Sequence, residues 1–362
     1  MMRGPRFETH EALPAGYLDG AVARILAVQD ADGAIPWFER GVFDPWNHLE
    51  AAMALNICGA SDAADRAYQY LFKKQHDDGS WWGELGSAVP IDETLQTFSR
   101  QSMETGQKIR DTNFISYCAL ACLHYWILRR DGAFLKEAMP VVTRAINFVL
   151  SLQSEHGDIR WTAPDPQTPE DDALLAGNSA IFKSLGCAIA LAEISQMECD
   201  PWREAHQRLG TALAHHPERF DRQWESKERF SMDWYYPVLS GALSIEEGNK
   251  RLEGKWDVFV EEGLGCRCVS DEPWVTTAES AELALALVAQ GDMDRAREHV
   301  RWLHQFRNDQ GAYWMGKQTQ HNVFWPVECP PWTAGAVILA IDAVAQLTPA
   351  NPIFTRDFAH AL

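Results

Sequence analysis

Most residues that could do chemistry in this sequence lie in six polar segments, each of which precedes an apolar stretch. Five of the six segments combine an acidic residue with an aromatic one. A carboxyl group packed against aromatic faces loses hydration, so its pKa rises and it can stay protonated at neutral pH. Two such carboxyls can also divide the acid and base steps of a hydrolysis. The segments are FDPWNHLE (43–50), RDTNF (110–114), AGNSA (176–180), SMDWYYP (231–237), SDEPWVTTAE (270–279) and FWPVECPPWT (324–333).

Asp233 is the strongest candidate for a catalytic acid, because the aromatic run 234–236 follows it directly. The faces of these rings would shelter a carbocation through cation–π attraction, or they would stack on the rings of a sugar. Glu279 and Asp271, in the fifth segment, are the expected catalytic partners. We therefore predict that Asp233, Glu279 and Asp271 carry the reaction.

Acids in such segments also have a structural interpretation, since Asp caps helix N-termini and suits the helix dipole. Capping alone explains Asp44 and Asp111 taken singly, but not the repeated pairing of acids with aromatic rings. Arg267 would bind a diphosphate or carboxylate, or pair with Asp271. The residues expected to contact substrate are Trp46, Asp44, Asp111, Asn178, Trp234, Tyr235, Tyr236, Arg267, Trp274, His321, Trp325, Glu328 and Trp332.

The elements that position these segments alternate between two kinds of helix. Amphipathic stretches, with apolar residues at i, i+3, i+4 and i+7, precede each polar segment. More apolar stretches follow it, and a helix that is apolar all round must be buried on all sides. The amphipathic stretches include 17–29, 63–75 and 141–153, with weaker ones near 201–214 and 244–261. The apolar stretches are 48–59, 114–128, 179–194, 234–243, 276–289 and 332–345.

Six such pairs predict an all-α fold, an (α/α)6 toroid of six helical hairpins. One hairpin cannot bury its inner helix alone, so we expect the set to fold as one domain over residues 1–362. The repeats span about 16–348, and little β-sheet is expected. An open solenoid would need polar end caps, which the sequence does not show.

A recurring turn joins the hairpins, and its four copies contain five of the 15 tryptophans. Glycine at these turns can take the positive φ that ends a helix, and the glutamine can pair with orphan backbone groups. The tryptophan would then cover the junction between hairpins. The four copies read QDADGAIPW (29–37), QHDDGSWW (75–82), QSEHGDIRW (153–161) and QFRNDQGAYW (305–314).

One long connection interrupts the pattern between the second turn and its inner helix. Residues 84–110 contain a short helical pattern within a segment that the repeat does not need. Long connections in compact domains often cover a site. We therefore predict that 84–110 forms a lid.

Composition excludes several classes of function. The net charge is −19, with 51 acidic and 32 basic residues, so nucleic acid, which is bound through Lys and Arg, is not an expected partner. No signal peptide or membrane span is expected. Cys266 and Cys268 are too closely spaced for the usual zinc clamp, so no metal is predicted. The eight cysteines are expected to be reduced thiols, which favours the cytoplasm.

The second turn resembles a known repeat. Gln75-x3-Gly79-x-Trp81, preceded by Leu71 and Phe72, is similar to the QW repeat of squalene–hopene and oxidosqualene cyclases. The same toroid occurs in class II diterpene cyclases and in the β subunits of protein prenyltransferases. The openings DTNFISYCALA (111–121) and PWTAGAVILA (331–340) are also similar to those repeats. The resemblance covers about 16–348.

This resemblance implies an enzyme of the prenyltransferase or terpenoid-cyclase type, in which protonation or ionisation starts carbocation chemistry in an acidic, aromatic cavity. It implies an apolar isoprenoid substrate, peripheral contact with a membrane, and no cofactor apart from Mg²⁺ if the substrate is a diphosphate. The sequence lacks the D-x-D-D, D-D-x-x-D and Asp-x-Cys motifs of these families. A carbohydrate-active (α/α)6 hydrolase or lyase with paired carboxylates is the alternative. A toroid that only binds a ligand or protein is the second alternative.

Overall fold

The computed structural model describes residues 13–39, 41–86, 109–163, 171–356 and 358. The predicted lid (84–110) therefore lies mostly outside the described residues. At its borders, the two-residue strand β2 (Leu85–Gly86) pairs antiparallel with β1 (Val42–Phe43).

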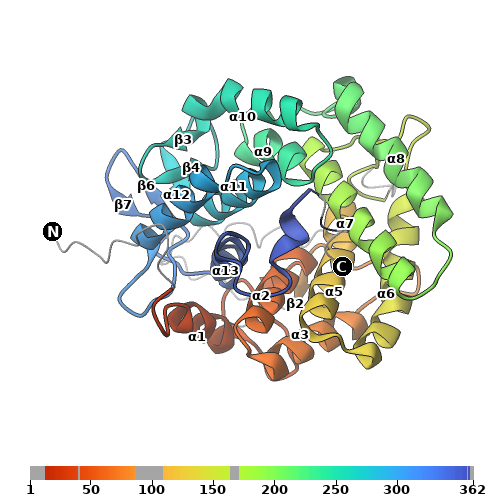
Figure 1. Cartoon of the computed structure of the whole chain (residues 1–362), viewed down its shortest axis with the longest axis horizontal. Coiled ribbons are helices and arrows are strands. Elements are labelled where there is room, and N and C mark those ends of the chain that lie inside the picture. The colour runs from red at the N-terminus through yellow and green to blue at the C-terminus, as the bar shows by residue number, and fades with distance from the viewer. Residues whose placement is uncertain (1–12, 40, 87–108, 164–170, 357, 359–362) are drawn as a thin grey trace.

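Six helical hairpins form a closed ring, as the sequence predicts (Figure 1). Each inner helix packs against the next, and the last packs against the first. The fold is therefore the predicted (α/α)6 toroid. The inner helices are α2 (Pro45–Ile57), α5 (Thr112–Arg129), α7 (Leu175–Ile194), α9 (Ser231–Leu239), α11 (Thr277–Gln290) and α13 (Pro331–Ala345). The outer helices are α1 (Asp19–Val28), α3 (Ser61–Lys73), α6 (Gly132–Leu150), α8 (Asp200–His215), α10 (Ile245–Phe259) and α12 (Met293–Leu303).

Burial explains the two compositions. An inner helix contacts two inner neighbours and its outer partner, so nearly every position of α11 and α13 is buried. An outer helix such as α3 buries one stripe only, with Ala64, Tyr68 and Leu71 fully covered. Among the described helices, α7 is the one long and apolar enough to cross a membrane, and 67% of its apolar window is buried inside the ring.

The C-terminal segment closes one end of the ring. The short 3-10 helix η4 (Asn351–Phe354) packs on α13 and α11, and Ile353 and Phe354 are buried. Lys183 donates a hydrogen bond of 2.7 Å to the Thr355 carbonyl, and Arg356 donates one of 3.0 Å to the Gly241 carbonyl beyond the end of α9. The opposite end, where the inner helices begin, forms the mouth of the ring.

A small antiparallel sheet lies beside the mouth. Its strands are two or three residues long, so the expectation of little sheet holds, but the sequence does not indicate their pairing. The strands lead into the N-terminus of α11 and connect α12 to α13. In spatial order they are β3 (Val260–Glu261), β4 (Gly265–Arg267), β5 (Trp274–Thr276), β6 (Gly316–Gln318) and β7 (Val323–Phe324).

The recurring turn acts as a clamp between neighbouring outer helices. The Gln75 side chain donates to the Gly79 carbonyl at 3.0 Å and to the Val141 carbonyl of α6 at 2.9 Å. Its oxygen accepts a 3.0 Å hydrogen bond from Arg144 Nε, also on α6. One amide thus satisfies a turn carbonyl and a carbonyl of the next hairpin. We refer to this arrangement as the glutamine clamp.

The glutamine clamp repeats at the first and third turns. Gln29 donates to Gly33 and Ala63 and accepts from Arg66. Gln153 donates to the Gly157 and Ala205 carbonyls and accepts from Arg208 in the same way.

The fourth turn departs from the clamp because it closes the ring. Gln305 donates instead to the Gly263 carbonyl, and Gly20 of α1 lies against the turn. A Cβ on Gly20 would lie 2.1 Å from the Gln310 carbonyl oxygen. Glycine at position 20 therefore permits the close contact between the first and last hairpins.

Replacing Gly79 with Ala should destabilise the ring. Gly79 has φ +94°, and an added Cβ would lie 2.3 Å from the Arg144 carbonyl oxygen, a backbone atom that cannot move freely. The positive φ alone costs about 1–3 kcal/mol for a non-glycine residue. Gly59→Ala is the matched control, because Gly59 has φ +78° with no atom nearby. We expect Gly79→Ala to lower the melting temperature clearly more than Gly59→Ala; equal losses would show that the close contact is unimportant.

Candidate active site

Acidic residues gather at the mouth because the first turns of the inner helices meet there. Asp44 and Asp111 are the N-caps of α2 and α5, while Asp233 and Glu279 lie in the first turns of α9 and α11. The sequence predicts that these entrances surround one opening, and the ring brings them to the same end.

A cleft of about 290 Å³ opens between the N-termini of α5, α7 and α9. Two acids, Asp111 and Asp233, line it together with the tryptophans Trp161 and Trp224. The two indole rings lie 5.0 Å apart at 56° to each other. Aromatic walls and two carboxyl groups therefore share one cavity.

Asp233 is 5% exposed, and burial raises the pKa of its carboxyl to about 6. Its Oδ1 atom is buried without a hydrogen-bond partner in the described part of the chain. Its backbone carbonyl accepts a 2.7 Å hydrogen bond from Arg251 on α10, which fixes the first turn of α9. The Asp233 carboxyl is thus held in place, and its Oδ1 atom can still accept a hydrogen bond.

Asp111 caps α5 through its Oδ1 atom. Its Oδ1 accepts hydrogen bonds from the amides of Asn113 and Phe114 at 2.8 and 3.1 Å. Burial raises the pKa of Asp111 to about 7, and the negative charge of Asp44 adds to this effect. In Asp44, by contrast, both oxygens accept hydrogen bonds, from Asn47 and from Trp37 Nε1.

Three buried polar atoms of cleft residues have no partner among the described residues. They are Asp233 Oδ1, Asn113 Oδ1 and Trp161 Nε1. Buried polar groups in proteins are almost always paired, so each exception calls for an explanation. Two acceptors and one donor beside aromatic rings suit a ligand with hydroxyl groups.

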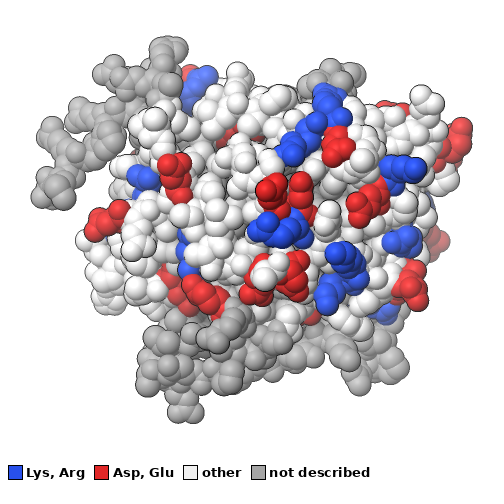
Figure 2. Space-filling view, turned by 90° about the horizontal axis from the view of Figure 1, so that it is seen from below, with Lys and Arg blue, Asp and Glu red and all other residues white. Residues whose placement is uncertain are grey.

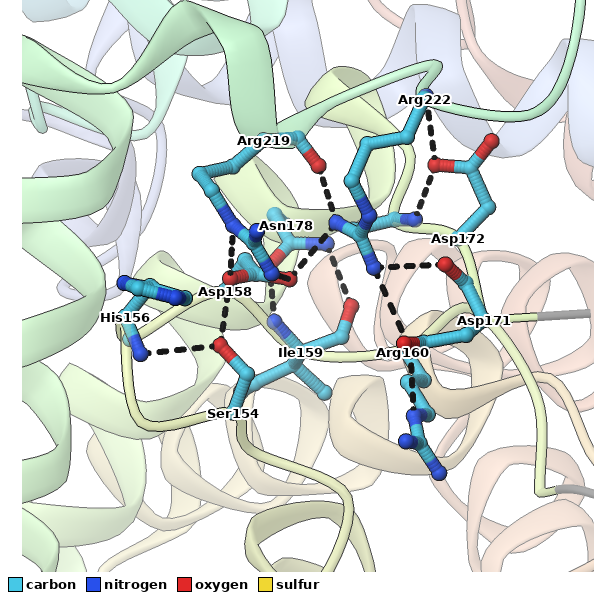
Figure 3. Close-up of polar contacts among 12 residues, drawn as sticks. Ser154, His156, Asp158, Ile159, Arg160, Asp171, Asp172, Asn178, Arg219 and Arg222 are labelled. Atoms are coloured by element: carbon cyan, nitrogen blue, oxygen red, sulfur yellow. Dashed lines mark hydrogen bonds and ion pairs between the residues drawn. The ribbon is translucent and has the colours of Figure 1, made fainter.

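A buried ionic network fixes the wall of the cleft (Figure 3). Asp158 is fully buried and accepts from Arg219 Nε and Arg222 Nη1, each at 2.9 Å. Burial opposes ionisation of Asp158, but the hydrogen bonds from Arg219 and Ser154 and the two arginine charges together lower its pKa. The network joins the third turn to the loop before α9.

Asp172 and Asn178 extend this support to the aromatic walls. Asp172 accepts from the backbone amides of Arg222, Gln223 and Trp224 at 2.9, 2.8 and 3.2 Å, and so holds the Trp224 backbone. Asn178 exchanges two hydrogen bonds of 2.8 Å with the backbone of Ile159, as Figure 3 also shows. Asn178, predicted as a substrate contact, therefore positions the loop that carries Trp161.

A second acidic group lies deeper, inside the ring. Glu282 accepts hydrogen bonds from the hydroxyls of Tyr235 and Tyr236. Burial, and then the charge of Glu282, raises the pKa of Glu50 well above its usual range. Trp46, predicted as a binding residue, stacks on Tyr117 beside this group, with 4.0 Å between ring centroids. A carboxyl pair is thus present beneath the mouth.

Three predicted site residues point away from the cleft. Asp271 is exposed and forms a 2.8 Å ion pair with Arg229. Arg267 pairs with Glu261 rather than with Asp271. Trp234 packs outward on Phe259 of α10, with ring centroids 5.1 Å apart.

The remaining predicted residues lie around the small sheet and the start of α13. Trp274 Nε1 donates a hydrogen bond of 2.7 Å to the Trp325 carbonyl. The Trp332 ring contacts the Trp37 ring edge to face. His321 is exposed at the turn between β6 and β7. Glu328 lies half-buried before α13, and its carbonyl accepts a hydrogen bond from the Met315 amide.

Sequence reasoning misses Trp161, Trp224 and Asn113 as cleft residues. The sequence places Trp161 and Trp224 at turns between hairpins, and nothing in a single sequence places their rings on a cavity. Asn113 directly follows the Asp-Thr opening of α5, and this position at the start of an inner helix is the sequence feature that could have identified it as a cleft residue. In the parts of the chain that the structure describes, no group of three His, Cys, Asp or Glu side chains is placed to hold a metal.

Comparison with known proteins decides the family. No family model matches the chain. MMP endo-(1,4)-3-O-methyl-alpha-D-mannosidase of Mycolicibacterium hassiacum is 41% identical over 330 residues, which cover 91% of this chain and 86% of that protein. The chain belongs to the family of this mannosidase. It is therefore an enzyme of the glycosidase class.

Solved structures agree in fold. A glycosidase variant in complex with glucose has a TM-score of 0.64 at 13% identity, over 92% of this chain and 97% of that one. A GH63 mannosylglycerate hydrolase from Thermus thermophilus, in complex with Tris and D-glycerate, has a TM-score of 0.64 at 12% identity, over 89% and 99%. At such identities these likenesses show the (α/α)6 toroid alone.

The predicted membership of the terpenoid cyclase and prenyltransferase group is wrong, because the relative that shares 41% of its residues is a mannosidase. The glutamine and glycine of the QW-like turn join one outer helix to the next, so these two residues indicate the toroid and not its chemistry. The carbohydrate-active alternative is the better one. The predicted apolar isoprenoid substrate is wrong for the same reason. Peripheral membrane contact is expected only for such a substrate, so that expectation loses its basis.

Removing Asp158 should destabilise the protein, because Asp158→Ala leaves Arg219 and Arg222 without their buried partner. Breaking a buried ion pair costs about 3–5 kcal/mol, and we expect the lower end because both arginines reach solvent. Asp271→Ala, which removes an exposed ion pair, is the control. Thermal unfolding should show a large loss for Asp158→Ala and little change for Asp271→Ala. Equal losses in both variants would contradict a special role for the buried network.

Proposed function

We propose that the protein is an endo-acting glycoside hydrolase that cleaves α-(1,4) bonds within a 3-O-methylated mannose polysaccharide. The observation that carries this proposal is the group of three unpartnered polar atoms, among the described residues, in an aromatic cleft that also holds two carboxyls. The 41% identity to the M. hassiacum mannosidase supports the choice of substrate class.

The cleft chemistry suits a sugar ring. The C–H faces of a pyranose can pack on Trp161 and Trp224, which lie 5.0 Å apart. Its hydroxyl groups can donate to Asp233 Oδ1 and accept from Trp161 Nε1, which would satisfy atoms that are otherwise costly to bury. Lys227, whose ammonium lies 5.0 Å over the Trp224 ring, reinforces that wall.

The two cleft acids can divide the catalytic roles by their pKa values. Asp111, with a pKa raised to about 7, is the proton donor. Because its Oδ1 accepts two backbone hydrogen bonds, the proton of the neutral form lies on Oδ2. Asp233, with a pKa raised to about 6, is more readily ionised and is the base.

In this mechanism Asp111 gives its proton to the glycosidic oxygen as the bond from that oxygen to the anomeric carbon breaks. Asp233 takes a proton from the water that attacks the same carbon. The products are two shorter sugars, with Asp111 ionised and Asp233 protonated, and exchange with water restores both acids. Attack by water from the opposite side inverts the anomeric configuration.

Hydrolysis of this kind needs only water and two carboxyl groups, and we propose that no metal or organic cofactor takes part. We also propose that the enzyme acts in the cytoplasm. All eight cysteines are free thiols, a state that a reducing compartment maintains.

Asp111→Asn and Asp233→Asn should abolish hydrolysis while leaving the protein folded. The substrate is a 3-O-methylated α-(1,4)-mannose polysaccharide, and mass spectrometry of products with and without a chelator is the readout. Each variant should lose at least about 100-fold in kcat, since positioned acid–base groups contribute roughly 10²–10⁴-fold. Asp271→Asn is the control and should retain full activity. Normal turnover by both cleft variants would rule out the assignment.

The pH dependence of kcat/KM should be bell-shaped. Asp233 must be ionised to act as a base, so activity should fall as pH drops below about 6. Asp111 must be protonated to act as an acid, so activity should fall as pH rises above about 7. Initial rates at low substrate concentration, from about pH 4 to about pH 9, provide the measurement. A profile that stays level across that range would contradict the two roles.

A further inference from the structure

The segment 323–327 presents an apolar outer face to solvent. Val323 is 48% exposed, Trp325 is 42% exposed and Val327 is 72% exposed, whereas the intervening residues are more covered. Val323 belongs to β7, and residues 325–327 form a bend that leads from this strand toward α13. We call these three residues, together with Trp274, the outer platform.

The platform is held rigidly by the sheet beneath it. Phe324 points the other way and stacks on Trp314, with ring centroids 5.8 Å apart. The Trp325 amide donates to the Gly316 carbonyl at 3.0 Å, and its carbonyl accepts from Trp274 Nε1 at 2.7 Å. The Trp274 and Trp325 rings meet edge to face at 5.4 Å. An exposed tryptophan fixed in this way against a half-buried one needs little reorganisation to bind a ligand.

The segments that carry the platform lead into two inner helices that begin at the mouth. Strand β5, which contains Trp274, leads directly into α11, whose first turn carries Glu279. The segment after Trp325 leads into α13. In the ring order, α11 and α13 lie across the mouth from α5 and α7, two of the three helices whose N-termini line the cleft. Figure 1 shows β6 and β7 on the side of α12.

We propose that the outer platform is a remote glycan-binding site, which holds sugar units of the chain whose scissile bond lies in the cleft. This inference rests on the proposed function, because a chain-internal cut requires sugars on both sides of the broken bond. A chain that leaves the cleft crosses the mouth and reaches Trp274 and Trp325. The methyl ethers of the substrate match the valine side chains, since burying apolar groups on both partners is favourable.

A protein partner fits this surface less well. A stable protein interface buries about 800 Å² on each partner, and the exposed parts of four side chains present much less. The patch also lies beside the mouth, where a docked protein would obstruct the entry of a long chain.

The test compares long and short substrates. Trp325→Ala should raise KM for the methylated mannose polysaccharide about tenfold, a change equivalent to about 1.4 kcal/mol, with kcat unchanged. For a short oligosaccharide that fills only the cleft, KM and kcat should both match the wild type. Val327→Ser, at a residue too exposed to affect folding, should show a smaller rise in the same direction. Leu347→Ala, an exposed apolar residue beyond the C-terminus of α13, is the control and should show no change.

Direct binding of the polysaccharide, measured by calorimetry, separates the outcomes. If both platform variants hydrolysed the long substrate with the same KM as the wild type, the platform would be overturned. The proposed function would still stand. If the protein bound the polysaccharide through Trp325 but did not hydrolyse it, the proposed function would be overturned and the platform would stand. A wild-type dimer that Trp325→Ala converts to a monomer, with glycan binding unchanged, would identify the platform as a self-association surface and overturn the inference. If the wild-type protein neither hydrolysed nor bound the polysaccharide, both the platform and the proposed function would be overturned.

Discussion

The glutamine clamp is the interaction on which the rest of the structure depends. At three successive junctions one side-chain amide pairs with the carbonyl of a turn and with a carbonyl of the next outer helix. The glycine in the turn lets the two backbones approach more closely than any side chain would allow. Because this contact sets the step from one hairpin to the next, it also sets the ring that brings the inner N-termini together. The acids at the mouth owe their proximity to it.

Rigid polar support continues from the third clamp to the cleft. The turn that contains Gly157 also contains Asp158, whose two arginines tie it to the loop before α9. That loop carries Trp224, and the strand-like segment after the turn carries Trp161. On the face that Figure 2 shows, acidic and basic side chains lie next to one another. The buried network around Asp158 and Asp172 serves to position the aromatic walls.

The helices and the ring are predictable from the sequence because burial leaves a periodic signal: α13 is apolar on every face and α3 on one only. Asp111 and Asp233 are predictable at the mouth, since they begin inner helices. The family is not predictable in this way, because the clamp residues are a property of the toroid that enzymes with unrelated chemistry can share. Asp271 and Arg267 lie in the right segment but point to other partners, Arg229 and Glu261. The direction of a side chain depends on strand pairing, and strands of two or three residues leave no readable pattern.

The most direct test of the central claim is a crystal structure of the Asp111→Asn variant with a bound methylated mannose oligosaccharide. We predict that one sugar ring lies between Asp111 and Asp233 on the Trp161 and Trp224 faces. Its hydroxyl groups should make hydrogen bonds with Trp161 Nε1 and Asp233 Oδ1, the atoms that lack partners among the described residues. A sugar bound deep in the ring beside Glu50 and Glu282, with the cleft atoms still unpartnered, would contradict the assignment of the active site.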